Sequence, residues 1–385
     1  MAHRLPYVRL SGFYFFYFGI LGAFLPYWPL YLKALGLDPA EIGQTMAILA
    51  ATKVVSPNLW GWLADHTGRT LSLIRWAAFF TLAAFGLVFP ADDFAAMALA
   101  VLAFSFFWNV TLPLFETVTL AHLRQAAHRY SRIRLWGSIG FIGAVVALGK
   151  ALEGVYSIVC LPQLIFLLFA IFWFNCLVVP EPPAEAPHGV QNGSMLEILG
   201  QGGVIGLFLA CLLLQVSHGP YYVFFSVYLE GHGYTSGETG LLWALGVLAE
   251  IALFAGVSRL MERVNLRVLF LGSLALGAGR WLLTAWGIDY LALIVLAQLL
   301  HAASFGSAHA ATIHLVHRHF RGPHHGKGQA LYSSLSFGLG GALGSLYSGQ
   351  FWDTWGPHWV FTAAAGFSLL ALAIAWPKVG RGEPA

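Results

Sequence analysis

Charged residues are scarce in this chain of 385 residues. Lys, Arg, Asp and Glu make up 10% of it, against about 25% in an average soluble domain. The formal net charge of +3 gives no reason to expect a nucleic-acid partner. The three cysteines, Cys160, Cys176 and Cys211, lie inside apolar segments without metal-ligand spacing. The composition therefore excludes an ordinary soluble domain and a disulfide framework, and we expect no cofactor and no metal.

Long apolar runs take the place of the missing charges. Hydrophobic residues make up 58% of the chain and the mean hydropathy is +0.72. A helix needs about 20 apolar residues to cross the hydrocarbon core of a bilayer. We therefore predict an all-α membrane protein with twelve transmembrane helices at 9–32, 42–63, 71–89, 95–122, 134–152, 156–178, 203–229, 239–259, 267–286, 290–316, 328–350 and 357–376.

Basic residues near the ends of these spans predict their orientation. Only Lys33 and Lys150 lie near one face, and the other basic residues near span ends lie at the opposite face, which is cytoplasmic by the positive-inside rule. We therefore expect a multi-pass protein of the inner (plasma) membrane, with both termini in the cytoplasm. The first apolar run is too long for a cleavable signal, so we expect it to remain. The basic residues on the cytoplasmic side are Arg4, Arg9, Arg69, Arg75, Arg124, Arg129, Arg132, Arg134, Arg259, Arg263, Arg267, Arg318, Arg321, Lys327, Lys378 and Arg381.

The second half of the sequence repeats the first. The offset is 197 residues throughout, and the matching pairs are Tyr31 and Tyr228, Gly43 and Gly240, Lys53 and Glu250, and Asp65 and Glu262. Two parallel repeats of six helices are the arrangement of major facilitator transporters. Between them the segment 180–200 is rich in proline and cannot span as a helix. We predict an N-terminal six-helix bundle at 1–179, a cytoplasmic linker at 180–200 and a C-terminal six-helix bundle at 201–385, around a central cavity.

Seven ionisable side chains fall in the middle of the predicted spans. A charge near the bilayer centre costs about 2.5 to 3.5 kcal/mol on insertion scales, so these groups must face one another or water. We expect them to line a path for a solute. They are Lys53, Glu116, Arg134, Glu250, Arg280, His301 and His309.

In the first half, a short basic loop joins the helix of Glu116 to the helix that Arg134 begins, so the guanidinium can reach toward the carboxylate. Asn109 lies seven residues before Glu116 and shares its helical face. A purely structural buried pair is the alternative, although such a pair gains little stability over apolar packing.

In the second half, Glu250, Arg280, His301 and His309 form the corresponding set, and Glu250 and His301 are the better candidates for coupled titration. A histidine that only packs is the alternative. Spacings of three and four residues place Gln215, His218 and Tyr222 on one polar face of the seventh helix.

The loop after the second helix reads Gly61-Trp62-Leu63-Ala64-Asp65-His66-Thr67-Gly68-Arg69 and resembles the loop signature of the major facilitator superfamily. The resemblance implies that Asp65 and Arg69, with Gly61 and Gly68, belong to a cytoplasmic charge latch of the alternating-access cycle. A chance turn is the alternative. Histidines at 314, 317, 319, 324 and 325 are expected to form a solvated basic loop, although a membrane metalloenzyme is conceivable.

Most of both halves resembles the phenylpropionate transporter group of this superfamily, which is related to the lactose permease. The resemblance implies that Glu116 and Arg134 match sugar-binding residues of that permease, and that Glu250, Arg280 and His301 match its Glu, Arg and His. Ser304 and Phe141 stand where the permease has a proton-carrying Glu and a sugar-stacking Trp. The stretches that carry the resemblance are Phe24 to Trp28 with Tyr31 to Lys33, Arg134 to Ser138, Leu214 and Gln215 with His218, Tyr221 and Tyr222, Gly246 to Glu250, Arg280 and Trp281, and Gln298 to His301 with Phe305 and His309.

Charge arithmetic favours an acidic solute. Lys53, Arg134 and Arg280 exceed Glu116 and Glu250 by one positive charge, which a monocarboxylate would balance. Aromatic walls from Phe141, Tyr17, Trp28, Trp108 and Tyr222 suit a ring.

The resulting hypothesis is a proton-coupled symporter of a small aromatic monocarboxylic acid, working as a monomer in the lipid bilayer and not as an enzyme. In it Arg134 and Lys53 attract the carboxylate, Glu116 holds Arg134, and Glu250 with His301 and Arg280 exchanges the proton. Symport of a sugar or nucleoside is the alternative, and a histidine-box metalloenzyme is a distant one.

Overall fold

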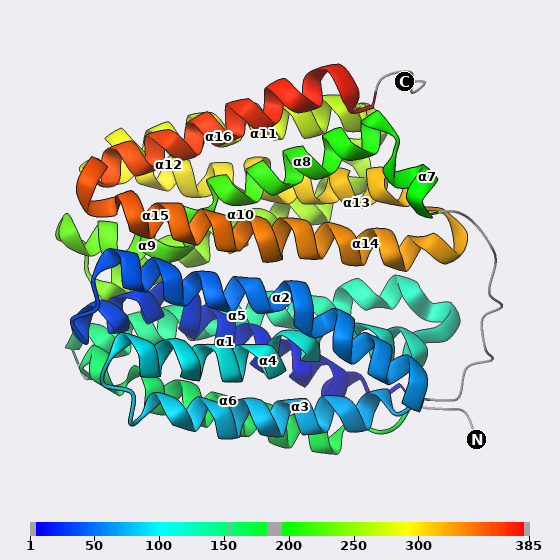
Figure 1. Ribbon diagram of the computed structural model, residues 1–385, viewed down its shortest axis with the longest axis horizontal. Helices are drawn as coiled ribbons and strands as arrows, with labels where there is room; N and C mark the ends of the chain where they lie inside the picture. The colour runs from blue at the N-terminus through cyan, green and yellow to red at the C-terminus, as the bar shows by residue number, and fades with distance from the viewer. Residues whose placement is uncertain (1–4, 155, 183–194, 381–385) are drawn as a thin grey trace. The chain divides into compact units, whose positions relative to one another are not determined.

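The computed structural model describes residues 5–154, 156–182 and 195–380, and within them the described chain is helical with no strand. Residues 183–194 of the predicted linker, and Arg4 and Arg381 among the predicted cytoplasmic residues, lie outside the described part. The helices belong to two compact units, residues 1–188 with 235–241 and residues 189–234 with 242–385. Figure 1 colours the helices from blue in the first bundle to red in the second.

Six long helices form the N-terminal bundle, as the apolar runs predict. The first helix packs along the fifth and sixth, and the fourth packs against the second and third. Aromatic rings fill the interior, where Phe13 stacks on Phe115 with centroids 3.5 Å apart. The helices are α1 (Tyr7–Ala34), α2 (Pro39–Thr67), α3 (Thr70–Phe85) with the 3-10 turn η1 (Gly86–Val88), α4 (Phe94–Leu123), α5 (Tyr130–Gly154) after η2 (Arg124–Arg129), and α6 (Leu161–Val178) after η3 (Ile158–Cys160).

The C-terminal bundle also has six spanning helices, but three of them are irregular. The short α7 (Met195–Leu199) precedes them. The regular ones are α10 (Ser236–Arg263), α11 (Leu266–Trp286) and α16 (Pro357–Lys378). The irregular ones are α8 (Gly202–Ser217) with α9 (Gly219–Gly231), α12 (Leu291–His301) with the π-helix η4 (Ala302–Gly306) and α13 (Ser307–His319), and α14 (His325–Ser333) after η5 (Gly322–His324) with the π-helix η6 (Ser334–Gly340) and α15 (Gly341–Trp355).

These helices confirm the predicted twelve-helix fold in two six-helix bundles. Ten of the described helices are long and apolar enough to cross a membrane by length and composition alone. The other two are α2 and the helix from α14 to α15. Polar residues such as Lys53 and Asp65 make α2 less apolar than the ten, and glycine and serine have the same effect in the second. The domain boundaries at 179 and 201 stay a prediction.

The structure repeats the loop after the first helix in the second half. Gly36 and Gly233, which are 197 residues apart, both have positive φ, +89° and +82°, where a side chain would be strained. Each follows a helix end in the pattern of a Schellman cap, with Leu37 N bonded to Leu32 O and Tyr234 N to Leu229 O. The next helices then start with equivalent capping boxes, Asp38 with Glu41 and Thr235 with Glu238.

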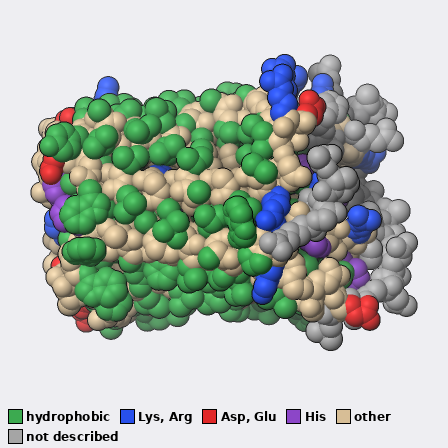
Figure 2. All heavy atoms as spheres, turned by 90° about the horizontal axis from the view of Figure 1, so that it is seen from above, with side chains coloured by type: hydrophobic (Ala, Val, Ile, Leu, Met, Phe, Trp, Pro, Cys, Tyr) green, Lys and Arg blue, Asp and Glu red, His purple; other side chains and the backbone are tan. Residues whose placement is uncertain are grey.

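The surface matches a protein embedded in lipid. Figure 2 shows hydrophobic side chains along most of the visible face and Lys and Arg gathered toward one end of it. Leu276, Leu369 and Trp376 are among the exposed hydrophobic residues, with exposed fractions of 45%, 52% and 59%. Such contiguous apolar surface is stable when lipid covers it.

Candidate functional site

In the N-terminal bundle, Glu116 lies within a cluster of hydroxyl groups, here called the Glu116 cluster: Tyr14, Glu116, Thr119, Tyr130 and Arg134. The Tyr130 hydroxyl donates to Oε1 of Glu116 at 3.0 Å. The Tyr14 hydroxyl donates to Oγ1 of Thr119 at 3.1 Å, and the rings of Tyr14 and Tyr130 meet edge to face. Three helices, α1, α4 and α5, thus converge on one carboxylate.

The Arg134 guanidinium is in this cluster but has a different main contact from the one expected. Its Cζ lies 3.8 Å from the centre of the Phe18 ring and 5.8 Å from that of Tyr14. Within the described part of the chain, no carboxylate lies at ion-pair distance from Arg134. Glu116 accepts a hydrogen bond from Tyr130. Glu116 and Arg134 are therefore neighbours without a direct salt bridge.

Asn109 lies one layer away and joins α4 to α2. Its Nδ2 donates to Oγ1 of Thr52 at 2.8 Å and to the Leu49 carbonyl at 2.9 Å, and Thr52 continues to Oγ of Ser105. Lys53 follows Thr52 directly and is half-buried, and no carboxylate of the described residues pairs with it.

Phe141 is buried on α5, and its backbone packs so closely on α1 that a Cβ at Gly22 would lie 2.6 Å from its carbonyl oxygen. This close approach explains why glycine stands at position 22, because any side chain there would separate the two helices. It fixes α5, which also carries Arg134, against α1.

In the C-terminal bundle a second polar group, here called the Arg280 cluster, has the members His218, Tyr221, Glu250, Arg280, Gln298 and His301. Arg280 Nε donates to the Ala297 carbonyl at 3.1 Å, and Nη1 lies 3.5 Å from Nε2 of His218. The Tyr221 hydroxyl donates to Oε1 of Gln298 at 2.9 Å. Four of the predicted residues, His218, Glu250, Arg280 and His301, are therefore brought together.

Glu250 and His301 form the one buried acid–base pair among the described residues. Nε2 of His301 lies 3.1 Å from Oε1 of Glu250, with exposed side-chain fractions of 8% and 18%. The imidazole stacks on Phe305, and Phe305 stacks in turn on His309 with nearly parallel planes. His309 bonds through Nδ1 to the Tyr332 hydroxyl at 3.0 Å. His309 is thus next to the cluster but one aromatic ring away from the acid.

The remaining predicted residues of the seventh helix lie at its break. His218 occupies the junction of α8 and α9, and its Nδ1 bonds to the Leu214 carbonyl at 2.8 Å. Tyr222 stacks on the imidazole of His218. Gln215 is buried beside Gly340 of η6. A Cβ added at Gly340 would lie 3.0 Å from the Cβ of Gln215. The three residues share a face as predicted, although the helix is not continuous through them.

The predicted latch residues lie at the end of α2. Gly68 closes this helix with φ +64°, and its amide bonds to the Ala64 carbonyl. Asp65 and Arg69 are exposed, and the described residues give neither an ion-pair partner. At Gly61 a Cβ would meet no described atom within 4 Å. The latch itself stays a prediction.

Five residues of the two clusters were not among the predicted site residues: Tyr14, Thr119, Tyr130, Tyr221 and Gln298. Tyr130 precedes Arg134 by four residues and so shares its helical face, which was an available signal. The contact of Tyr221 with Gln298 spans 77 residues of sequence, and no local pattern indicates it.

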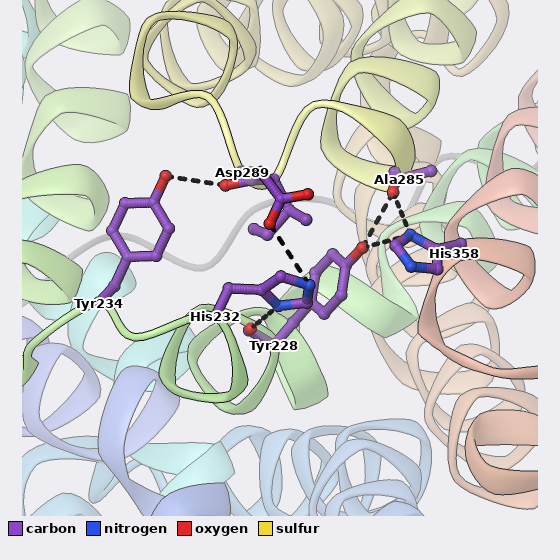
Figure 3. Close-up of polar contacts among 7 residues, drawn as sticks. Tyr228, His232, Tyr234, Ala285, Asp289 and His358 are labelled. Atoms are coloured by element: carbon purple, nitrogen blue, oxygen red, sulfur yellow. Dashed lines mark hydrogen bonds and ion pairs between the residues drawn. The ribbon is translucent and has the colours of Figure 1, made fainter.

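Figure 3 shows a further cluster that the sequence did not indicate, where α9 and α11 end and α16 begins. The hydroxyl of Tyr228 and Nδ1 of His358 both bond to the Ala285 carbonyl, at 2.9 Å and 2.6 Å. Because a carbonyl only accepts, Nδ1 of His358 carries the proton. His232 lies 3.9 Å from Asp289, which is 71% exposed. This cluster ties three helix ends together, away from the Arg280 cluster.

Comparisons with known proteins agree with this architecture. The model of the MFS_1 like family matches residues 7–363. The "Probable 3-phenylpropionic acid transporter" of Escherichia coli (strain K12) is 28% identical over 376 residues, covering 95% of this chain and 96% of that protein. The maltose permease of Geobacillus stearothermophilus is 26% identical, covering 89% of this chain and 87% of the permease.

Among solved structures, the nucleoside transporter NupG superposes with a TM-score of 0.81 at 19% sequence identity, covering 97% of this chain and 98% of that chain. At this identity the likeness shows the fold alone. The family and the relatives are transporters and not enzymes, which contradicts the metalloenzyme alternative. The chain is a multi-pass membrane transporter that belongs to the MFS_1 like family of the major facilitator superfamily.

Proposed function

We propose that this secondary transporter moves a small aromatic monocarboxylic acid together with a proton by alternating access. The observation that carries the proposal is an imbalance among the buried charges. Both intramembrane carboxylates have a partner, Tyr130 for Glu116 and His301 for Glu250. The intramembrane cations Lys53, Arg134 and Arg280 have no carboxylate at ion-pair distance among the described residues.

An anionic substrate follows from the cost of that imbalance. A cation in the membrane interior is expensive when it has no counter-charge, and a buried charge without a partner is strongly destabilising. One monocarboxylate offsets the single excess positive charge. We therefore infer that an anionic acid, rather than a neutral solute, balances the excess positive charge when it binds.

An aromatic acid is favoured by the surroundings of the charges. In the N-terminal bundle, Arg134 lies over the ring of Phe18, whereas Trp28 and Trp108 are enclosed in the interior, with exposed fractions of 0% and 1%. In the C-terminal bundle, Tyr222 stacks on His218. Rings offer stacking surface to another ring. The name of the relative from Escherichia coli, a 3-phenylpropionic acid transporter, supports the same class.

Proton coupling is assigned to Glu250 and His301. Nε2 of His301 lies 3.1 Å from Oε1 of Glu250, so protonation of the carboxylate changes its interaction with the imidazole, and the two groups titrate as a coupled pair. Arg280 contacts His218 and belongs to the same cluster as Glu250 and His301. A change of charge at Glu250 therefore alters the electric field at the guanidinium. The proton would thereby change which state of the transporter is favoured.

In the proposed orientation the protein lies in the inner (plasma) membrane and both termini are in the cytoplasm. Arg75, Arg267 and Lys378 lie near helix ends on the side predicted to be cytoplasmic, and basic residues favour that side. The protein is proposed to act as a monomer with lipid around it.

Competition in proteoliposomes tests the substrate class. Proteoliposomes that contain the purified protein are loaded with unlabelled 3-phenylpropionate. Counterflow of the labelled acid is then measured while an excess of another aromatic acid, maltose or uridine is present outside as a competitor. We expect aromatic acids alone to compete. Absence of counterflow of the acid, with counterflow of labelled maltose or uridine under the same conditions, would overturn the proposal and favour the second candidate, a sugar or nucleoside symporter. The names of the maltose permease and of the nucleoside transporter support that candidate.

A further inference from the structure

Arg280 is the most completely enclosed charge in the described chain. Its exposed fraction is 0%, and it lies on α11 within the C-terminal bundle. Of its donors, Nε is satisfied by the Ala297 carbonyl at 3.1 Å. Nη1 has only a long contact of 3.5 Å to His218, and Nη2 has no hydrogen-bond partner. The unsatisfied part of the guanidinium is therefore the end formed by Nη1 and Nη2.

A second unsatisfied donor belongs to the same cluster. Nε2 of Gln298 is buried without a partner, while Oε1 of that side chain accepts from Tyr221. The ring of Tyr221 also lies 4.4 Å from Cζ of Arg280, so one tyrosine contacts both side chains. Two neighbouring side chains thus present donors that lack an acceptor. Buried donors are rarely left without an acceptor. A group that only accepts hydrogen bonds would satisfy the donors of both Arg280 and Gln298.

We propose that the Nη1–Nη2 end of Arg280, together with the amide of Gln298, binds the carboxylate of the transported acid. This assignment rests on the function proposed above and names the residues that hold the acid. Two parallel N–H donors match the two oxygens of a carboxylate. A hydroxyl offers one oxygen, so a sugar gains less from this end. The contact to His218 is long and is readily exchanged for a carboxylate oxygen.

The rings around Arg280 hold its orientation. Cζ lies 4.3 Å from the ring of Trp281 and 4.4 Å from that of Tyr221. The Trp281 indole is in turn fixed by a hydrogen bond from Nε1 to Oγ of Ser217. These neighbours limit rotation of the guanidinium and leave its unsatisfied end as the binding element.

Arg134, the other guanidinium of the interior, differs in this respect. None of its nitrogens is among the buried atoms without a partner, and its main contact is the face of Phe18. It is only half-buried, whereas Arg280 is fully enclosed. It therefore contributes a general positive field, whereas Arg280 contributes the specific contact.

Equilibrium binding separates these roles. Labelled 3-phenylpropionate is bound to the purified full chain in lipid nanodiscs, with 3-phenylpropanamide as a competitor that keeps the ring and shape but lacks the charge. We expect R280Q to weaken binding of the acid about 10-fold or more, and to leave the amide within about twofold of wild type. R134Q is the comparison: because Arg134 contributes only the general field, we expect it to weaken binding of the acid less than R280Q does and to keep the preference for the acid over the amide.

Gln298→Glu provides a variant that need not perturb folding. Glutamate keeps the shape of Gln298 and still accepts from Tyr221, but it places a fixed carboxylate beside the donors. We expect Q298E to lose acid binding while its unfolding temperature stays at or above that of wild type. Retained acid preference in both R280Q and Q298E, with its loss in R134Q, would overturn the assignment and leave acid transport standing. A wild-type protein that binds neither acid nor amide would instead contradict the proposed function.

Discussion

Single residues show how this chain accommodates charge inside apolar helices. Glu116 accepts from a tyrosine hydroxyl rather than from Arg134, which the sequence suggested as its partner, whereas Glu250 lies at ion-pair distance from His301, as the sequence suggested. Arg134 and Arg280 instead lie over aromatic rings.

Glu250→Gln tests the proton role at this scale. The amide keeps the shape and a contact to His301 but cannot change its charge. We expect the variant to lose accumulation driven by a pH gradient about 10-fold or more, while exchange of labelled for unlabelled acid falls by less than about threefold. Both rates are measured in proteoliposomes. Glu262→Gln is the control, because Glu262 is exposed on the same helix. Full accumulation in the E250Q variant would show that the proton is carried elsewhere.

At the scale of elements, both halves use an arginine of the third helix to cap the last helix, although Arg75 and Arg267 are not at equivalent positions of the repeat. In the N-terminal bundle, Arg75 of α3 donates to the carbonyls of Cys176 and Val179 at the end of α6. In the C-terminal bundle, Arg267 of α11 donates to the carbonyls of Trp376 and Val379 at the end of α16. The third helix of each half thus caps the last helix of the same half, satisfying carbonyls that a helix end leaves free.

Removal of these caps has a predicted cost. We expect Arg75→Gln and Arg267→Gln each to lower the unfolding temperature by about 3 to 6 °C, since charge-assisted bonds to carbonyls of about 1.5 to 3 kcal/mol are lost. Thermal unfolding in detergent, followed by the exposure of buried cysteines such as Cys176 and Cys211, measures the change. Arg263→Gln, which alters an exposed arginine at the end of α10, should leave it unchanged. Equal effects at all three positions would indicate a general response to lost charge.

Irregular elements were beyond prediction from the sequence. The seventh, tenth and eleventh spans were expected as continuous helices, but the structure breaks the first at His218 and places π-helical turns in the other two. Hydrophobic periodicity indicates a helix without distinguishing a π turn within it. His301 immediately precedes η4, so the irregularity lies beside the acid–base pair.

For the whole molecule, long apolar runs and the offset of 197 residues were enough to predict twelve helices in two repeats. The charged members of the site were also identifiable, because a charge in an apolar run is conspicuous. Their partners were not. Tyr14 with Thr119 and Tyr221 with Gln298 join distant helices, and such pairing depends on how the helices pack. Sequence therefore indicated candidate site residues, and the structure showed which of them interact.

The central claim is that uptake of an aromatic acid is driven by a proton. The most direct measurement is uptake of labelled 3-phenylpropionate into proteoliposomes that contain an internal pH dye, with an acidic exterior or with equal pH on both sides. Protein-free liposomes subtract passive entry of the protonated acid. The account predicts accumulation above the external concentration with internal acidification, both abolished at equal pH. Uptake that only equilibrates, with no proton movement beyond the protein-free background, would contradict it.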